Sequence, residues 1–144
     1  MSRVSGDTLV ALVVSALLVA AMAIDHLVGT STEPGEESGL ADPGAFVASS
    51  VVSLVLMAVL FVFVVRRTPD PDVAGRRGLL CSGLAVPAVV LAFLGLPYPF
   101  AAAGIALGLR GRSGRHGRLA TTAVALGSLV VVAITAGYVG ALIA

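Results

Sequence analysis

Four long runs of apolar residues, almost free of charge, restrict the folds that this chain can adopt. A bilayer core about 30 Å thick is crossed by a helix of roughly 20 residues, so apolar runs of about 18 residues or more predict membrane spans. Of the residues, 58% are hydrophobic and 12% are charged, whereas soluble domains average about 45–50% and 25%. We therefore predict an all-α integral membrane protein, a polytopic helical bundle built as one domain over residues 1–144.

The boundaries of the apolar segments follow from where charge, glycine and proline interrupt the runs. We expect an acidic outer loop, rich in glycine and proline, at 29–44, and basic inner loops at 66–78 and 110–118. Pro69 and Pro71 prevent the second span from continuing as a helix. The expected spans lie at 8–28, 45–65, 79–96 and 119–143, with a short helix at 100–109 after the third.

The third apolar segment, 79–109, is too long for a single crossing, since one helix of that length would extend about 46 Å. Prolines at 97 and 99 flank Tyr98 and are incompatible with a continuous helix. The segment therefore breaks there into a crossing helix and a short returning helix. Cytoplasmic loops carry an excess of basic residues, and only this hairpin puts all nine arginines on one side. A single crossing stays open as the alternative, because 100–109 spans only about 15 Å.

The N-terminal segment has two interpretations. Arg3, a long apolar run and Ala21-Met22-Ala23 fit a signal peptide that is cleaved near residue 23. The apolar run is long for such a peptide, and Asp7 is placed to cap a helix, so we expect a retained span with the N-terminus inside. The lack of Lys, Asn, Gln and Trp beside abundant Ala, Val, Gly and Leu indicates a GC-rich bacterial genome, and hence the plasma membrane.

The C-terminal half carries a pattern of proline, small residues and arginine. A proline precedes a short Gly/Ala helix that ends in arginine, and a Gly-Arg linker leads to a helix that begins L-A-x-x-x-x-x-L-G. The matching positions are Pro99, Gly104, Gly108, Arg110, Gly117, Arg118, Leu119, Ala120, Leu126 and Gly127. Over residues 78–140 the chain resembles a widespread bacterial membrane domain of unknown function. The resemblance implies the hairpin and no particular activity.

Asp25 and His26 are the acid and the histidine that fall inside a predicted span, and ionisable residues at such places often mark ion pathways. Counted from Thr8, Asp25 lies about 25 Å along the helix, close to the outer interface, where its carboxylate reaches headgroup water. We expect this interfacial role, because no other span carries a charge with which to form a relay. Ion or proton handling is the alternative.

Arginines gather in the two basic connectors, and their first role is to set topology. Binding of anionic lipid headgroups is a second role, worth about 1 kcal/mol per basic residue near such a surface. The candidates for both roles are Arg66, Arg67, Arg76, Arg77, Arg110, Arg112, Arg115 and Arg118.

Small residues at helical spacing form stripes that let membrane helices approach closely. The contacts that they make lie either within the monomer, which we favour, or against a partner. The packing candidates are Ala88, Ala92, Gly95, Gly104, Gly108, Ala123, Gly127, Gly137 and Gly140.

Motifs for catalysis or cofactor binding are missing from the sequence. Cys81 is the single cysteine, and two histidines make no metal shell. The glycine-rich segment 108–118 lacks the spacing and the lysine of a phosphate-binding loop, and the basic clusters lack the aromatic residues of nucleic-acid binders. We expect no enzyme, cofactor, metal or nucleic-acid partner. The sequence favours an accessory subunit or scaffold that acts by helix packing, with the lipid bilayer, anionic lipids, another membrane protein or itself as partner. A small oligomeric transporter or channel is the alternative.

Overall fold

The computed structural model describes residues 6–30 and 43–143, and all its elements are helical. A π-helical segment, η1, continues α2, and a 3-10 segment, η2, continues α3. The elements are α1 (Gly6–Thr30), α2 (Pro43–Val59), η1 (Leu60–Val65), α3 (Pro71–Ala88), η2 (Val89–Leu94), α4 (Pro97–Gly111) and α5 (Gly117–Ile143).

Four of the helical segments are long and apolar enough to cross a membrane, which confirms the predicted fold class of a polytopic all-α bundle. They are Gly6–Ile24, Phe46–Val65, Pro71–Leu91 and Gly117–Ile143. Because a helix rises about 1.5 Å per residue, each covers close to the thickness of a bilayer core or more. Four apolar helices of this length are consistent with a multi-pass membrane protein.

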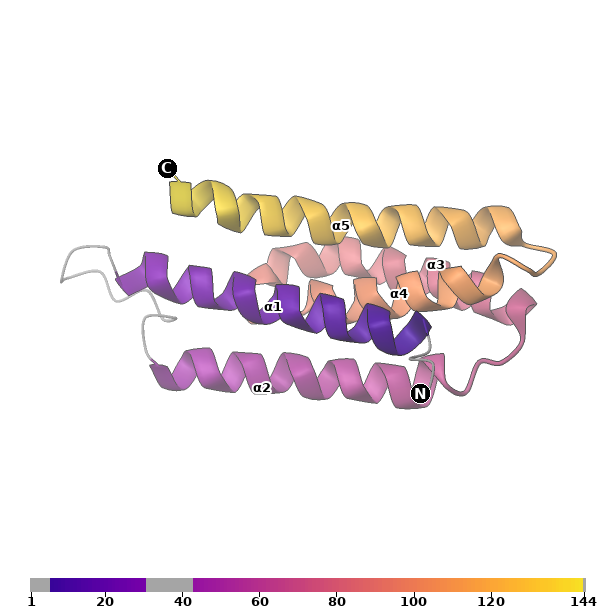
Figure 1. Cartoon of the computed structure of the whole chain (residues 1–144), viewed down its shortest axis with the longest axis horizontal. Coiled ribbons are helices and arrows are strands. Elements are labelled where there is room, and N and C mark those ends of the chain that lie inside the picture. Colours follow the sequence, from indigo (N-terminus) through magenta and orange to yellow (C-terminus); the bar gives the residue numbers. More distant parts are fainter. Residues whose placement is uncertain (1–5, 31–42, 144) are drawn as a thin grey trace.

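Successive helices run in opposite directions, so the connections alternate between two ends of the bundle (Figure 1). One end holds the start of α1, the connection from η1 to α3 and the turn from α4 to α5. All eight arginines of the described residues lie at or near these three places, and we call this the arginine-rich end. The predicted sidedness, with both basic connectors at one end, is therefore present in the fold.

The connection from η1 to α3 is shorter than the predicted loop 66–78. Helix α3 begins at Pro71, where the fixed φ of proline suits the first helical position. Because proline has no N–H, it leaves no unbonded backbone donor at this position. Asp70 precedes it as the N-cap, and its side chain accepts a hydrogen bond from the backbone N–H of Asp72 at 2.9 Å. Proline thus ends one helix and starts the next, and Arg76 and Arg77 lie on helix α3 rather than in a loop.

Residues 79–109 form a hairpin, and its turn lies just before the two prolines. Gly95 adopts φ 68°, a left-handed conformation open to glycine without strain. Helix α4 then runs from Pro97 to Gly111, 15 residues, which is about 22 Å and longer than the predicted 100–109. The returning segment therefore reaches the arginine-rich end, where the short predicted helix would have fallen short.

The hairpin tip is buried within the bundle rather than at its far surface. A Cβ at Gly95 would lie 2.6 Å from Leu18 Cδ1 and 2.9 Å from Ser53 Oγ, and Leu18 is about 18 Å along α1 from Gly6. Backbone donors at a helix start are costly inside a membrane unless they are bonded. Here Pro97 and Pro99 have no N–H, and Tyr98 N–H donates to the Gly95 carbonyl oxygen at 3.3 Å.

The core is made by α3, α4 and α5, which pack closely through small residues. Ala85, Ala102, Ala106 and Ala120 are fully buried. Around this core, α1 contributes larger side chains such as Val14, Leu18 and Met22, and α2 contributes Met57. The small residues bring the backbones together, and the larger ones fill the space where α1 and α2 approach.

Candidate functional site

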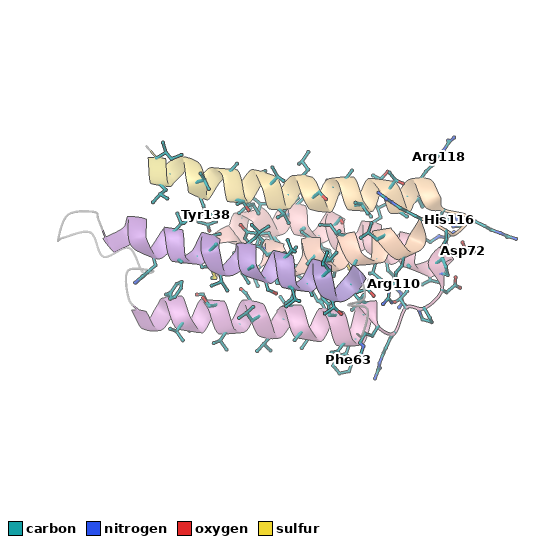
Figure 2. All side chains as sticks on the ribbon, in the orientation of Figure 1. Phe63, Asp72, Arg110, His116, Arg118 and Tyr138 are labelled. Atoms are coloured by element: carbon teal, nitrogen blue, oxygen red, sulfur yellow. The ribbon has the colours of Figure 1, made fainter. Side chains whose placement is uncertain are left out.

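Arg110 joins three elements at the arginine-rich end. Its guanidinium forms an ion pair with Asp7 in the first turn of α1 and donates a hydrogen bond to the Val65 carbonyl oxygen at 2.6 Å. Figure 2 places Arg110 at this end, near the start of α1. Five N–H donors on a planar group suit such bridging. Arg110 therefore ties the end of α4 to the start of α1 and the end of η1.

A second set of bonds closes the connection between η1 and α3. The Thr68 hydroxyl donates to the Val64 carbonyl oxygen at 2.6 Å, and the Thr68 hydroxyl oxygen accepts from the Arg77 guanidinium at 2.8 Å. Thr68 is 2% exposed, so its hydroxyl would cost free energy without these partners. Arg77 thus has a structural contact in addition to its charge.

The turn from α4 to α5 docks onto the start of α3. The Asp72 carboxylate accepts from the backbone N–H of Arg115 at 2.5 Å, and a Cβ at Gly114 would meet the backbone carbon of Pro71 at 2.9 Å. Close by, Arg76 Nη2 and His116 Nε2 are 3.2 Å apart. Glycine at 114 is therefore needed for the close approach, and Asp72 holds the turn in place.

Positive charge dominates this end of the bundle. Its described residues include eight arginines against three aspartates, Asp7, Asp70 and Asp72. The Arg67 guanidinium lies 4.9 Å from the centre of the Phe63 ring, a cation–π distance. The side chains of Arg66, Arg76, Arg77, Arg112, Arg115 and Arg118 are exposed. Such a surface suits anionic headgroups, whose attraction adds up over several basic residues.

Two pockets open at the arginine-rich end. One, of about 280 Å³, lies among α1, η1 and α4 and is lined by Asp7, Phe61, Arg66 and Arg110, among others. The other, of about 600 Å³, lies at the start of α5 and is lined by Arg112, Gly117, Arg118, Thr121 and Thr122. The first already contains an ion pair, whereas the second holds two arginines with no carboxylate in its wall.

The stripe predicted around Gly104, Gly108, Ala123 and Gly127 lies at the contacts of α3, α4 and α5. A Cβ at Gly104 would lie 2.8 Å from the backbone nitrogen of Ser82, and one at Gly108 would lie 2.8 Å from the Ala120 carbonyl oxygen. At Gly127 it would meet the Ala101 carbonyl oxygen at 3.0 Å, and Ala123 is fully buried. Helix backbones are therefore in direct contact at these positions.

The other small residues are placed differently. Gly95 forms the hairpin turn, and Ala88 is half-buried at the end of α3. A Cβ added to Gly137 or Gly140 would meet nothing within 4 Å, so neither glycine packs within the monomer. The side chain of Ala92 lies outside the described residues.

Asp25 and His26 lie in the last turns of α1, at the end of the bundle away from the arginines. The His26 ring stacks on Phe46 of α2, with ring centres 5.1 Å apart and planes at 27°. The side chain of Asp25 lies outside the described part of the structure. In that part, no three His, Cys, Asp or Glu residues come together as metal ligands would.

Some residues that organise the bundle were missed from the sequence. The buried Ser82 hydroxyl donates to the Ala123 carbonyl oxygen at 2.7 Å and so links α3 to α5. Gly75, Gly78, Ser82 and Ala85 follow at steps of three, four and three, a helical stripe of small residues that the sequence does contain. The bond from Asp72 to the α4–α5 turn joins residues 43 positions apart, and nothing in the local pattern indicates it.

Comparison with known proteins adds no assignment: no family model, no curated protein and no solved structure matches the chain. The geometry of the described residues is therefore the evidence that bears on function.

Proposed function

We propose that the protein is a non-catalytic integral membrane protein of the bacterial plasma membrane, an accessory subunit or scaffold that acts through helix contacts. The observation that supports this most is the backbone contact between α3 and α4. A Cβ at Gly78 would lie 2.9 Å from the backbone nitrogen of Gly108 and 3.1 Å from the Gly104 carbonyl oxygen. Helices this close leave no room between them for water or a solute, which favours a packing role over transport.

The polar groups inside the bundle support the same proposal. The Ser82 hydroxyl is bonded to the Ala123 carbonyl oxygen, and the Tyr98 hydroxyl lies 3.2 Å from Thr135 Oγ1. Groups bonded to one another in this way stabilise a fixed packing. A transport path needs polar atoms that a passing solute can bind, so the alternative of an oligomeric channel would have to place its path between copies of the chain.

The proposed orientation has the arginine-rich end in the cytoplasm, because cytoplasmic connectors carry the excess of basic residues. The proposal also includes membership of residues 78–140 in the widespread membrane domain that they resemble. The compact packing of α3, α4 and α5 supports this, since the resemblance implies a hairpin followed by one long helix.

A flux measurement separates the two functions. The purified chain is reconstituted into liposomes, and proton and potassium leakage is compared with that of empty liposomes. The scaffold proposal predicts equal leakage in both preparations. Leakage that depends on the protein and falls in an Asp25→Asn variant would establish the transporter instead.

A tryptophan scan of exposed apolar positions tests the packing role itself. Each variant, for example Val55→Trp or Val132→Trp, is expressed in a deletion strain at matched levels, and the deletion phenotype is scored. Both side chains are more than half exposed, so the fold tolerates the change, whereas a partner helix seated there would not. We expect at least one helix face to lose complementation while insertion stays normal. Full complementation at every exposed position would exclude a scaffold.

A further inference from the structure

The pocket at the start of α5 combines features of a lipid headgroup site. Arg112 is the C-cap that follows α4, and Arg118 is the second residue of α5. The guanidinium groups of both are exposed and form no hydrogen bond or ion pair with the described residues. Figure 2 shows Arg118 projecting from the end of the bundle. Two unpaired guanidinium groups in one pocket of about 600 Å³ suit a phosphate, which arginine binds through paired N–H donors.

The depth of the pocket agrees with the headgroup region of a bilayer. Helix α5 has 27 residues, about 40 Å, and so exceeds a bilayer core of about 30 Å by roughly 10 Å. Thr121 and Thr122 lie about 6 to 8 Å from the start of this helix. The pocket is therefore at the level where the phosphates of one leaflet lie.

The two threonines indicate which headgroup fits. The Thr121 hydroxyl donates to the Gly117 carbonyl oxygen and the Thr122 hydroxyl to that of Arg118, both at 2.9 Å. Their protons are therefore used, while lone pairs on both oxygens remain able to accept. A ligand for this pocket should carry a phosphate for the arginines and a neutral hydroxyl donor for the threonines. An ammonium headgroup would bring positive charge beside Arg112 and Arg118.

We propose that this pocket binds the headgroup of an anionic phosphoglycerol lipid, with the phosphate between Arg112 and Arg118 and the glycerol hydroxyls at Thr121 and Thr122. The proposal is independent of the scaffold function, because a transporter could hold the same lipid.

The test is native mass spectrometry of the whole chain in neutral detergent, titrated with phosphoglycerol or phosphocholine lipids of the same chains. Each basic residue near an anionic group contributes about fivefold in affinity, so two predict a preference of about 30-fold for phosphoglycerol. Arg112→Gln with Arg118→Gln should remove that preference. The control, Arg66→Gln with Arg67→Gln, makes the same change of charge elsewhere at this end. At 0.15 M salt it should stay within about twofold of the parent, because distant exposed charges are screened.

A further comparison tests the headgroup. Thr121→Val with Thr122→Val should remove an about fivefold preference for phosphoglycerol over a phosphomethyl lipid, whereas the two Thr→Ser changes should keep it.

Three results would overturn the proposal. The first is equal affinity for phosphoglycerol and phosphocholine lipids. The second is an equal loss of affinity from the two arginine pairs, which would show that only diffuse charge acts. The third is binding of water-soluble glycerol phosphate as tight as that of the lipid, which would make the pocket a free-anion site.

Discussion

Gly104→Ala is a sharp test of the backbone contact in the core. The added Cβ would lie 2.8 Å from the backbone nitrogen of Ser82 and 3.0 Å from the Gly78 carbonyl oxygen. These are backbone atoms of α3, so α3 and α4 must move apart. Overpacking of this kind costs about 1–3 kcal/mol, and the displaced Ser82 hydroxyl loses a bond worth about 0.6 kcal/mol between membrane helices. Alanine regains about 1 kcal/mol of helix propensity, which leaves a net loss of stability of about 0.5–2.5 kcal/mol.

The chain offers a matched control in Gly83→Ala. Gly83 also lies within a helix of the hairpin, but a Cβ there would meet nothing within 4 Å. Only the propensity gain applies, so this variant should be as stable as the parent or more stable by up to about 1 kcal/mol. The two variants are compared by reversible unfolding in mixed micelles of sodium dodecyl sulfate, followed by circular dichroism. If both shift the unfolding midpoint in the same direction, the direct backbone contact between α3 and α4 is not present in the protein.

Three further outcomes follow from other contacts. Ser82→Ala removes the link to α5 and should lower the free energy of unfolding by about 0.6 kcal/mol; an unchanged value in the same micelle assay would mean that the bond adds nothing. Arg110→Gln should lower the free energy of unfolding by about 2 kcal/mol, because it breaks the hydrogen bond from the charged guanidinium to the Val65 carbonyl oxygen. Asp7→Asn should lower it by less than about 1 kcal/mol, because it removes only a partly exposed ion pair. Equal losses for the two variants in unfolding titrations would contradict the larger role given to the Val65 bond. Ser113→Cys in a Cys81→Ser background should react with an impermeant maleimide only when the cytoplasmic face is opened, and labelling of intact cells would reverse the proposed orientation.

The helical membrane class and the hairpin could be predicted because neither depends on how the helices pack. Long uncharged runs determine the spans, and Pro97 and Pro99 interrupt the helix whatever lies next to it. The errors at the starts of α3 and α4 have one cause. A proline after an apolar run indicates the end of a helix, but Pro71 and Pro97 each start one. At Pro71 the cap formed by Asp70 distinguishes the two cases.

Tertiary placement was beyond the sequence, because small residues look alike whether they face a helix or lipid. Gly127 and Gly137 both belong to stripes on α5, yet a Cβ at the first would touch the Ala101 carbonyl oxygen and one at the second would touch nothing within 4 Å. In the sequence, Arg112 and Arg118 likewise indicate positive charge but not a pocket. Its shape depends on how the α4–α5 turn docks through Asp72, which is a contact between distant parts of the chain.

The hairpin also bears on how the chain enters the membrane. Residues 79–109 carry no charged side chain, and both ends of the hairpin lie at the arginine-rich end. Inserting it therefore carries no charge through hydrocarbon, where each would cost about 2.5–3.5 kcal/mol at the centre. The prolines at 97 and 99 lower the cost further, because they bring no N–H into the lipid. The hairpin can thus enter from the arginine-rich side as one unit, without any connecting loop being passed to the other face.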